Sequence, residues 1–142
     1  MTNANVDYVL DSFALLALFQ DEPGADQVDQ LLRGAQRGQV YLAMTVINLG
    51  EVIYRTIREK GLARADEVLA RIEELAIKIV DVDRELALTA AYLKGSHRLA
   101  YAGCMVAALA QRVDGTIVTG DPDFHQLESV VSVQWLPAAE AQ

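Results

Sequence analysis

The order of short apolar runs and longer amphipathic segments constrains the fold of this chain more than any other feature. Brief runs rich in Val, Ile, Leu and Tyr alternate with segments of about 10 to 15 residues whose apolar positions recur every three or four residues. Strands that alternate with helices in this way form parallel pairs, because each helix carries the chain back to the edge where the previous strand began. The sequence therefore predicts an α/β fold with a parallel sheet covered by helices on both faces.

Five strands and six helices are expected, and turn residues separate several of them. Gly38 stands where a glycine ends a helix, Thr45 is a good N-cap for the next helix, and Gly61 ends that helix. The expected strands cover residues 6–10, 40–43, 77–82, 116–119 and 130–133. The expected helices cover residues 12–19, 25–37, 46–60, 63–76, 84–94 and 101–112.

Length and composition favour one domain over residues 1–142, with no membrane segment. The longest apolar run, residues 13–19, is far shorter than the roughly 20 residues that span a bilayer. No basic segment followed by an apolar stretch opens the sequence, so no secretory signal is expected. A single cysteine, Cys104, rules out an internal disulfide and a cysteine-based zinc site. We expect a cytoplasmic protein.

The net charge of −8 argues against a protein that wraps a long duplex, because such proteins neutralise phosphates with a basic surface. Basic residues nevertheless concentrate in residues 55–71, where acidic residues are interleaved with them. This segment is either a solvated helix face of mixed charge or a surface that steers a short single strand. The basic residues are Arg55, Arg58, Lys60, Arg64 and Arg71.

Several acidic residues stand where a parallel α/β sheet binds ligands, beyond the carboxyl ends of its strands. Asp11 follows the first expected strand, and Asp121 and Asp123 follow the fourth. Glu51 lies in the middle of a helix, between apolar residues and beside Gly50. A glycine inside a helix costs about 1 kcal/mol relative to alanine, which suggests that another group approaches the helix there.

Each acid also has a structural interpretation that the sequence leaves open. Asp11 and Asp121 are favoured N-caps for the segments that follow them, and Glu51 could pair with Arg55 one helical turn later. If the acids instead converge at one sheet edge, they repel one another, and a hard divalent cation such as Mg²⁺ relieves that repulsion. Such a cation supports phosphodiester hydrolysis.

Three segments together resemble the PIN domain, and most closely the VapC-type toxins of toxin–antitoxin pairs. They are Asp11-Ser12 at the end of a strand, residues 48–52 (NLGEV) on a helix, and residues 119–124 (TGDPDF). The resemblance implies an α/β/α sandwich around a five-stranded parallel sheet of order 3-2-1-4-5. It also implies an endoribonuclease that depends on Mg²⁺ or Mn²⁺, a homodimer, and a cognate antitoxin that blocks cleavage of RNA.

The resemblance assigns roles to individual residues. Asp11, Glu51 and Asp121 match the catalytic acids that bind the metal ion, and Asp123 is an auxiliary ligand. Ser12 or Thr119 would supply a hydroxyl that positions the attacking water.

One position departs from the family pattern. Gly103 stands where the family usually has a further Asp, at the start of the helix over residues 101–112. Losing one carboxylate, whether by a natural or an introduced replacement, should weaken the cation site. The chain is then either a ribonuclease with reduced activity or a degenerate PIN domain that binds RNA or an antitoxin without cutting.

Structural roles are expected for the remaining reactive side chains. Cys104 is expected to be a buried apolar residue, His97 to lie in a loop, and His125 to lie near the acids without a strong reason for substrate contact. Tyr54, Tyr101 and Trp135 are too scattered to predict a surface for base stacking. A phosphate-accepting receiver domain, suggested by Asp81 and Asp83, is disfavoured because no lysine follows the fifth strand.

Overall fold

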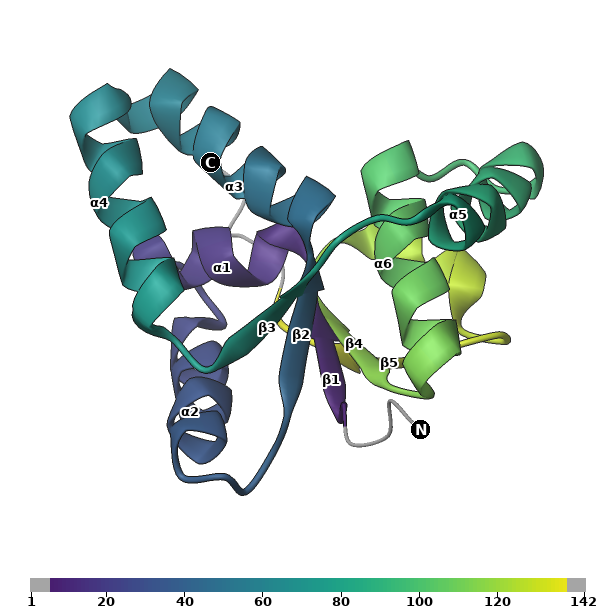
Figure 1. Cartoon of the computed structure of the whole chain (residues 1–142), viewed down its shortest axis with the longest axis horizontal. Helices are drawn as coiled ribbons and strands as arrows, with labels where there is room; N and C mark the ends of the chain where they lie inside the picture. The colour runs from purple at the N-terminus through teal and green to yellow at the C-terminus, as the bar shows by residue number, and fades with distance from the viewer. Residues whose placement is uncertain (1–5, 138–142) are drawn as a thin grey trace.

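A parallel sheet of five short strands lies at the centre of the computed structural model, which describes residues 6–137 (Figure 1). The strand order is β3-β2-β1-β4-β5, and all four neighbouring pairs are parallel. This order confirms the predicted α/β class and topology. The strands are β1 (Tyr8–Leu10), β2 (Leu42–Thr45), β3 (Ile77–Val80), β4 (Thr116–Thr119) and β5 (Ser132–Trp135).

Helices cover both faces of the sheet (Figure 1). One face packs against α1 (Ser12–Phe19), α2 (Ala25–Gln36), α3 (Val46–Lys60) and α4 (Leu62–Glu74). The other face packs against α5 (Arg84–Ser96), α6 (Tyr101–Val113) and the 3₁₀ helix η1 (Pro122–Leu127). No helix within residues 6–137 is long and apolar enough to cross a membrane.

Two apolar cores, one on each face, explain the continuous apolar runs of the central strands. Successive side chains of a strand point to opposite faces. Val9 and Ile117 accordingly join the core beneath α5 and α6, whereas Leu10 and Val118 join the core beneath α1 to α4. Both sets are fully buried, as expected for a sheet covered on both sides.

The predicted helix boundaries follow from capping groups. The Thr45 hydroxyl accepts a hydrogen bond from the Asn48 backbone N–H at 3.1 Å and caps α3. The Asp11 carboxylate accepts one from the Ala14 N–H at 3.0 Å and caps α1. Gly38, with φ of 74°, ends the turn after α2 in the left-handed region, as predicted.

Two strands lie two residues later than predicted. The strand expected at 40–43 is β2 at Leu42–Thr45, because Tyr41 is exposed and the strand continues to the residue that caps α3. The strand expected at 130–133 is β5 at Ser132–Trp135, because Val130 is exposed in the turn that follows η1. Both shifts extend the strands toward the edge of the sheet where the acids lie.

Candidate active site

Asp11 is the most buried of the predicted acids and is held by both of its oxygens. It follows β1, and its side chain is only 4% exposed. Its Oδ1 accepts the capping bond from Ala14, and its Oδ2 accepts a hydrogen bond from the Thr119 hydroxyl at the end of β4. The capping interpretation of Asp11 is therefore correct. The two hydrogen bonds also fix the carboxylate at the sheet edge.

Glu51 is held by the first residue of α1. The Ser12 hydroxyl donates to Glu51 Oε1 at 2.8 Å and so joins two helices that lie 39 residues apart in sequence. The ion pairs in residues 6–137 do not include the alternative partner, Arg55. Apart from the backbone of α3 itself, nothing in residues 6–137 lies within 4 Å of a Cβ added at Gly50, so no protein group described by the structure approaches the helix there.

Asp121 is connected to Asp11 through Thr119. The Asp121 backbone N–H donates to Thr119 Oγ1 at 3.0 Å, and the same hydroxyl donates to Asp11. Asp121 also caps η1, since its Oδ1 accepts from the Asp123 N–H at 2.9 Å. Ser12 and Thr119 thus both use their hydroxyls to position acids.

A small cavity of about 80 Å³ brings Asp11, Glu51 and Asp121 together. Asp123 is exposed and does not line this cavity, so its contact with the cluster is the backbone bond to Asp121. The other lining residues are Ser12, Phe13, Asn48, Arg55, Leu99, Ala100, Ala102, Gly103 and Phe124.

The electrostatics of the cavity favour a bound cation. The pKa of Asp11 is raised from 3.8 to about 7, chiefly by burial. The hydrogen bonds from Thr119 and Ala14 oppose this rise, and the charges of Asp121 and Glu51 add to it. A carboxylic acid with such a pKa is a candidate functional group. A cation in the cavity would stabilise the charged form and lower the pKa again.

Carboxylate oxygens are the ligands that hard divalent cations prefer. Within residues 6–137, no three His, Cys, Asp or Glu side chains are grouped closely enough to form a complete metal site. Mg²⁺ does not require one, because it is typically held by one or two carboxylates together with water and substrate phosphates. The buried Asp11 and the half-buried Glu51 and Asp121 could therefore hold a divalent cation together with water and substrate phosphates.

Leu99 occupies the space beside Gly103. A Cβ added to Gly103 would lie 3.0 Å from both Cγ and Cδ1 of Leu99, whose side chain is buried. Gly103 is thus accompanied by a leucine packed close against the helix. An acidic side chain at position 103 would require Leu99 to shift by a few tenths of an ångström.

Gly120 has no room for a side chain. A Cβ there would overlap the ring of Phe13 and lie 3.0 Å from the Pro137 carbonyl oxygen. The glycine between Thr119 and Asp121 therefore allows Phe13, in the first turn of α1, to pack directly on the loop that presents Asp121. The sequence pattern contained this glycine, but its partner is visible only in the structure.

Asn48 and Arg55 line the cavity but were not predicted as site residues. Asn48 is buried, its Nδ2 donates to the Ala102 carbonyl at 3.2 Å, and its Oδ1 accepts from the Thr45 hydroxyl. It thereby ties the start of α3 to α6. Its signal in the sequence was a polar residue three positions after a helix N-cap.

The basic segment 55–71 is divided among several environments. Arg55 lines the acidic cavity. Arg58 stacks over the Tyr54 ring at 5.0 Å, and Arg64 donates to the Phe19 carbonyl at 3.2 Å. Only Arg55 thus combines with the acids in one cavity, while the other cations lie along α3 and α4.

Three other reactive residues have structural roles. Cys104 is fully buried, and burial raises the pKa of its thiol, as expected for an unreactive cysteine. His97 follows α5, with Nδ1 2.9 Å from the Leu93 carbonyl oxygen. Asp83 caps α5 and pairs with Arg112 at 2.8 Å, and that hydrogen bond holds the pKa of Asp83 below its ordinary value. Asp83, one of the two acids that suggested a receiver domain, therefore forms a helix cap and an ion pair.

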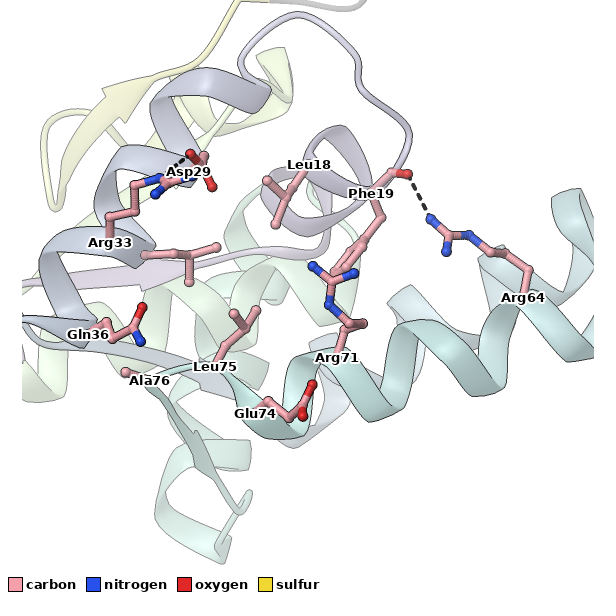
Figure 2. A pocket seen from close by; sticks show the side chains of 11 residues that line it. Leu18, Phe19, Asp29, Arg33, Gln36, Arg64, Arg71, Glu74, Leu75 and Ala76 are labelled. Carbon is pink, nitrogen blue, oxygen red and sulfur yellow. Dashed lines mark hydrogen bonds and ion pairs between the residues drawn. The ribbon is translucent and has the colours of Figure 1, made fainter.

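A second and larger cavity, of about 520 Å³, lies between the end of α1, α2 and α4 (Figure 2). Leu18, Leu32 and Leu75 contribute apolar surface, and three arginines line it. One of them, Arg33, is paired with Asp29 at 2.7 Å. None of the predicted site acids reaches this cavity, so the larger volume is not the acidic site.

Comparison with known proteins places the fold in a family. The model of the PIN domain matches residues 8–130 of this chain. A search of curated proteins finds no significant sequence match.

Solved structures share the fold at low sequence identity. VapBC2 from Rickettsia felis, solved bound to a fragment of its promoter DNA, has a TM-score of 0.73 at 16% identity and covers 92% of this chain and 99% of that chain. VapC20 from Mycobacterium tuberculosis, a sarcin–ricin loop cleaving toxin, has a TM-score of 0.69 at 14% identity, with 84% and 94% covered. VapBC-5 from the same organism has a TM-score of 0.60 at 20% identity, with 96% and 100% covered. The sheet topology and the match over residues 8–130 agree, and this chain belongs to the PIN domain family.

Proposed function

We propose that this chain is a VapC-type toxin, a cytoplasmic endoribonuclease that uses Mg²⁺ or Mn²⁺ held by Asp11, Glu51 and Asp121. The observation that supports this most directly is the cavity in which Asp11 is buried beside the two other acids. Repulsion among three carboxylates favours a cation there, and a cation among carboxylates favours phosphodiester hydrolysis.

The residues of the chain prepare this site before substrate arrives. Thr119 holds Asp11 and Asp121 at one sheet edge, and Ser12 directs Glu51 toward them. Arg55, which also lines the cavity, supplies a positive charge for an RNA phosphate. When bound, the divalent cation stabilises charge on the phosphate and lowers the pKa of the attacking water. Asp123 orients Asp121 through its backbone N–H.

Restoring a carboxylate at position 103 tests the metal site. We expect Gly103→Asp to raise cleavage of RNA by about 10- to 100-fold in Mg²⁺ or Mn²⁺, which corresponds to roughly 1.4 to 2.8 kcal/mol of transition-state stabilisation. The measurement is the initial rate on a pool of structured and single-stranded RNAs.

Gly103→Asn is the matched control, because it crowds Leu99 to the same extent but adds no charge. It should leave cleavage at the level of the original chain. Equal rates for Asp and Asn at position 103 would contradict a carboxylate effect. A chain that already cuts as fast as Gly103→Asp would show that the three remaining acids suffice.

A second candidate function is a degenerate PIN domain that binds RNA or an antitoxin without cutting. It is favoured by one observation, the Leu99 side chain packed so close to Gly103 that an acidic side chain at this position would require it to shift. This candidate predicts binding without turnover in any divalent metal. Cleavage by the purified chain that depends on metal and on Asp11 would exclude it.

We also propose that a cognate antitoxin protein inhibits this chain. The support is that several structures with this fold were solved as VapBC toxin–antitoxin pairs, including the one from Rickettsia felis. In this proposal, one equivalent of antitoxin suppresses the cleavage measured above. Cleavage that persists in the stoichiometric complex would argue against it.

A homodimer is the expected assembly. Exposed apolar side chains on α3 and α5 offer the surface for it, among them Ile47, Tyr54, Leu88 and Tyr92. Sedimentation velocity at micromolar concentration should give twice the 15.5 kDa mass of the chain. A monomer mass at that concentration would overturn this proposal.

A further inference from the structure

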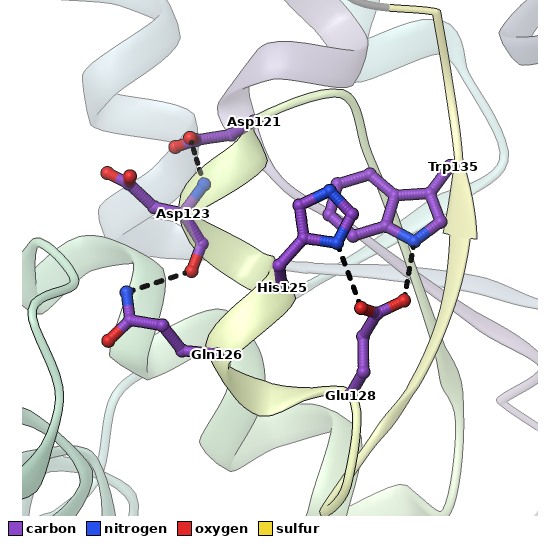
Figure 3. Close-up of polar contacts among 6 residues, drawn as sticks. All are labelled: Asp121, Asp123, His125, Gln126, Glu128 and Trp135. Carbon is purple, nitrogen blue, oxygen red and sulfur yellow. Dashed lines mark hydrogen bonds and ion pairs between the residues drawn. The ribbon is translucent and has the colours of Figure 1, made fainter.

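Two aromatic rings, one on η1 and one on β5, are stacked and joined by one carboxylate (Figure 3). The centroids of the His125 and Trp135 rings are 4.1 Å apart, and the ring planes differ by 24°. Glu128 contacts both rings, with one oxygen 2.8 Å from His125 Nδ1 and the other accepting from Trp135 Nε1 at 2.9 Å. We call His125, Glu128 and Trp135 the aromatic platform.

The topology places this platform next to the acids. Trp135 is the last residue of β5 and is the register partner of Thr119, whose hydroxyl holds Asp11. His125 lies on η1, the short helix that Asp121 caps. Adjacent strands are only about 4.8 Å apart, so Trp135 flanks the same edge of the sheet. Neither Tyr54 nor Tyr101 takes part in this stack, and the sequence alone does not show that His125 lies over Trp135.

Trp135 is half-buried, whereas His125 is exposed. Trp135 packs against the core beneath α6, whereas the His125 side chain is 61% exposed. One face of the imidazole therefore covers the indole, and the opposite face is turned outward. The hydrogen bonds from His125 and Trp135 hold the pKa of Glu128 below its ordinary value, so the carboxylate that fixes both rings is ionised at neutral pH.

Fold stability does not explain this arrangement. Ion pairs and hydrogen bonds at exposed positions contribute little, since water competes for the same groups. The contact with Glu128 fixes the orientation of the exposed His125 ring. Rigid exposed aromatic rings are among the elements from which single-stranded RNA sites are built.

We propose that the outward face of His125, supported by Trp135, stacks a nucleobase of single-stranded RNA next to the bond to be cut. This inference rests on the proposed ribonuclease function and adds a substrate contact to it. The platform selects an unpaired base at one position of the substrate. A base can stack on His125 only if it is neither paired nor stacked on its neighbours in the RNA.

Equilibrium binding of RNA tests the platform separately from cleavage. A labelled single-stranded RNA is titrated in Ca²⁺, which takes oxygen ligands like those of Mg²⁺, and its length is checked afterwards on a gel. His125→Ala should raise the Kd about 5- to 100-fold, the loss expected for one stacked base. His125→Phe should restore binding to within about threefold of the original Kd, because a phenyl ring presents a similar face.

Two controls make the result specific to stacking. Tyr41→Ala removes an aromatic ring that is 53% exposed just before β2, at the opposite edge of the sheet from the acids, and should leave the Kd unchanged. An abasic strand with the same phosphates should bind weakly and respond little to His125→Ala. Trp135 is the only tryptophan of the chain. Its fluorescence should therefore change on saturation with the base-bearing strand but not with the abasic strand.

The outcomes separate this inference from the ribonuclease proposal. A Kd for His125→Ala within twofold of the original overturns the platform, as does equal binding of abasic and base-bearing strands. Failure of the original chain to bind any RNA also overturns it. None of these results uses cleavage, which Asp11→Asn tests independently.

Discussion

Replacing Asp11 by Asn is expected to lower metal-dependent cleavage of RNA by about 1000-fold or more. Asn keeps the shape of the side chain and its capping bond to Ala14, but it removes the charge that is buried between Thr119 and the cavity. A cation that loses an anchored carboxylate loses several kcal/mol of transition-state stabilisation, and each 1.36 kcal/mol is tenfold in rate. The measurement is kcat/KM in Mg²⁺ and in Mn²⁺, in the original chain and in Gly103→Asp.

Asp26→Asn is the matched control for this experiment, because Asp26 is exposed in the first turn of α2 and far from the cavity lining. It should retain full cleavage. If Asp11→Asn cuts as fast as this control, the acids of the cavity are not the catalytic group. Circular dichroism of both variants establishes that the fold is intact.

The metal-free chain is expected to lose stability as the pH rises from about 4 to about 7. The folded pKa of Asp11 is raised to about 7 from 3.8, chiefly by burial. Between these values the folded chain binds more protons than the unfolded chain, so the free energy of unfolding falls with pH and levels off above 7. A pKa shift of this size lowers the free energy of unfolding by an amount on the order of 4 kcal/mol. Glu51, Asp121 and the cation Arg55 line the same cavity as Asp11.

Urea unfolding at pH 5, 6, 7 and 8 in the presence of a chelator measures this dependence. Asp11→Asn should flatten the profile and be more stable than the original chain at pH 8. Asp83 and Glu128 have lowered pKa values, so their stabilisation is lost only below about pH 4 and does not affect this range. Mg²⁺ should stabilise the original chain more at pH 8 than at pH 5, because it binds the ionised carboxylate. A profile that rises over this range, or the same slope in Asp11→Asn, would contradict the assignment.

The order of strands and helices could be predicted from the sequence because it depends on local rules. Apolar periodicity distinguishes strands from helices, and Asp11, Thr45 and Gly38 mark boundaries through bonds and backbone angles within a few residues. The predicted positions of β2 and β5 were two residues early, since strand ends depend on neighbouring strands rather than on the segment itself. The candidate acids could be named because they follow strands whose carboxyl ends share one edge of a parallel sheet.

Only the tertiary structure decided how those acids are held and what surrounds them. Ser12 reaches Glu51 across 39 residues, and Thr119 reaches Asp11 across 108. Leu99 filling the space beside Gly103, and His125 lying flat on Trp135, likewise depend on side chains that packing brings together. Local propensity determines which element a residue joins, but contact between distant side chains depends on strand register and helix packing. For that reason the sequence determined which residues stand at the edge of the sheet, and the fold decided which of them touch.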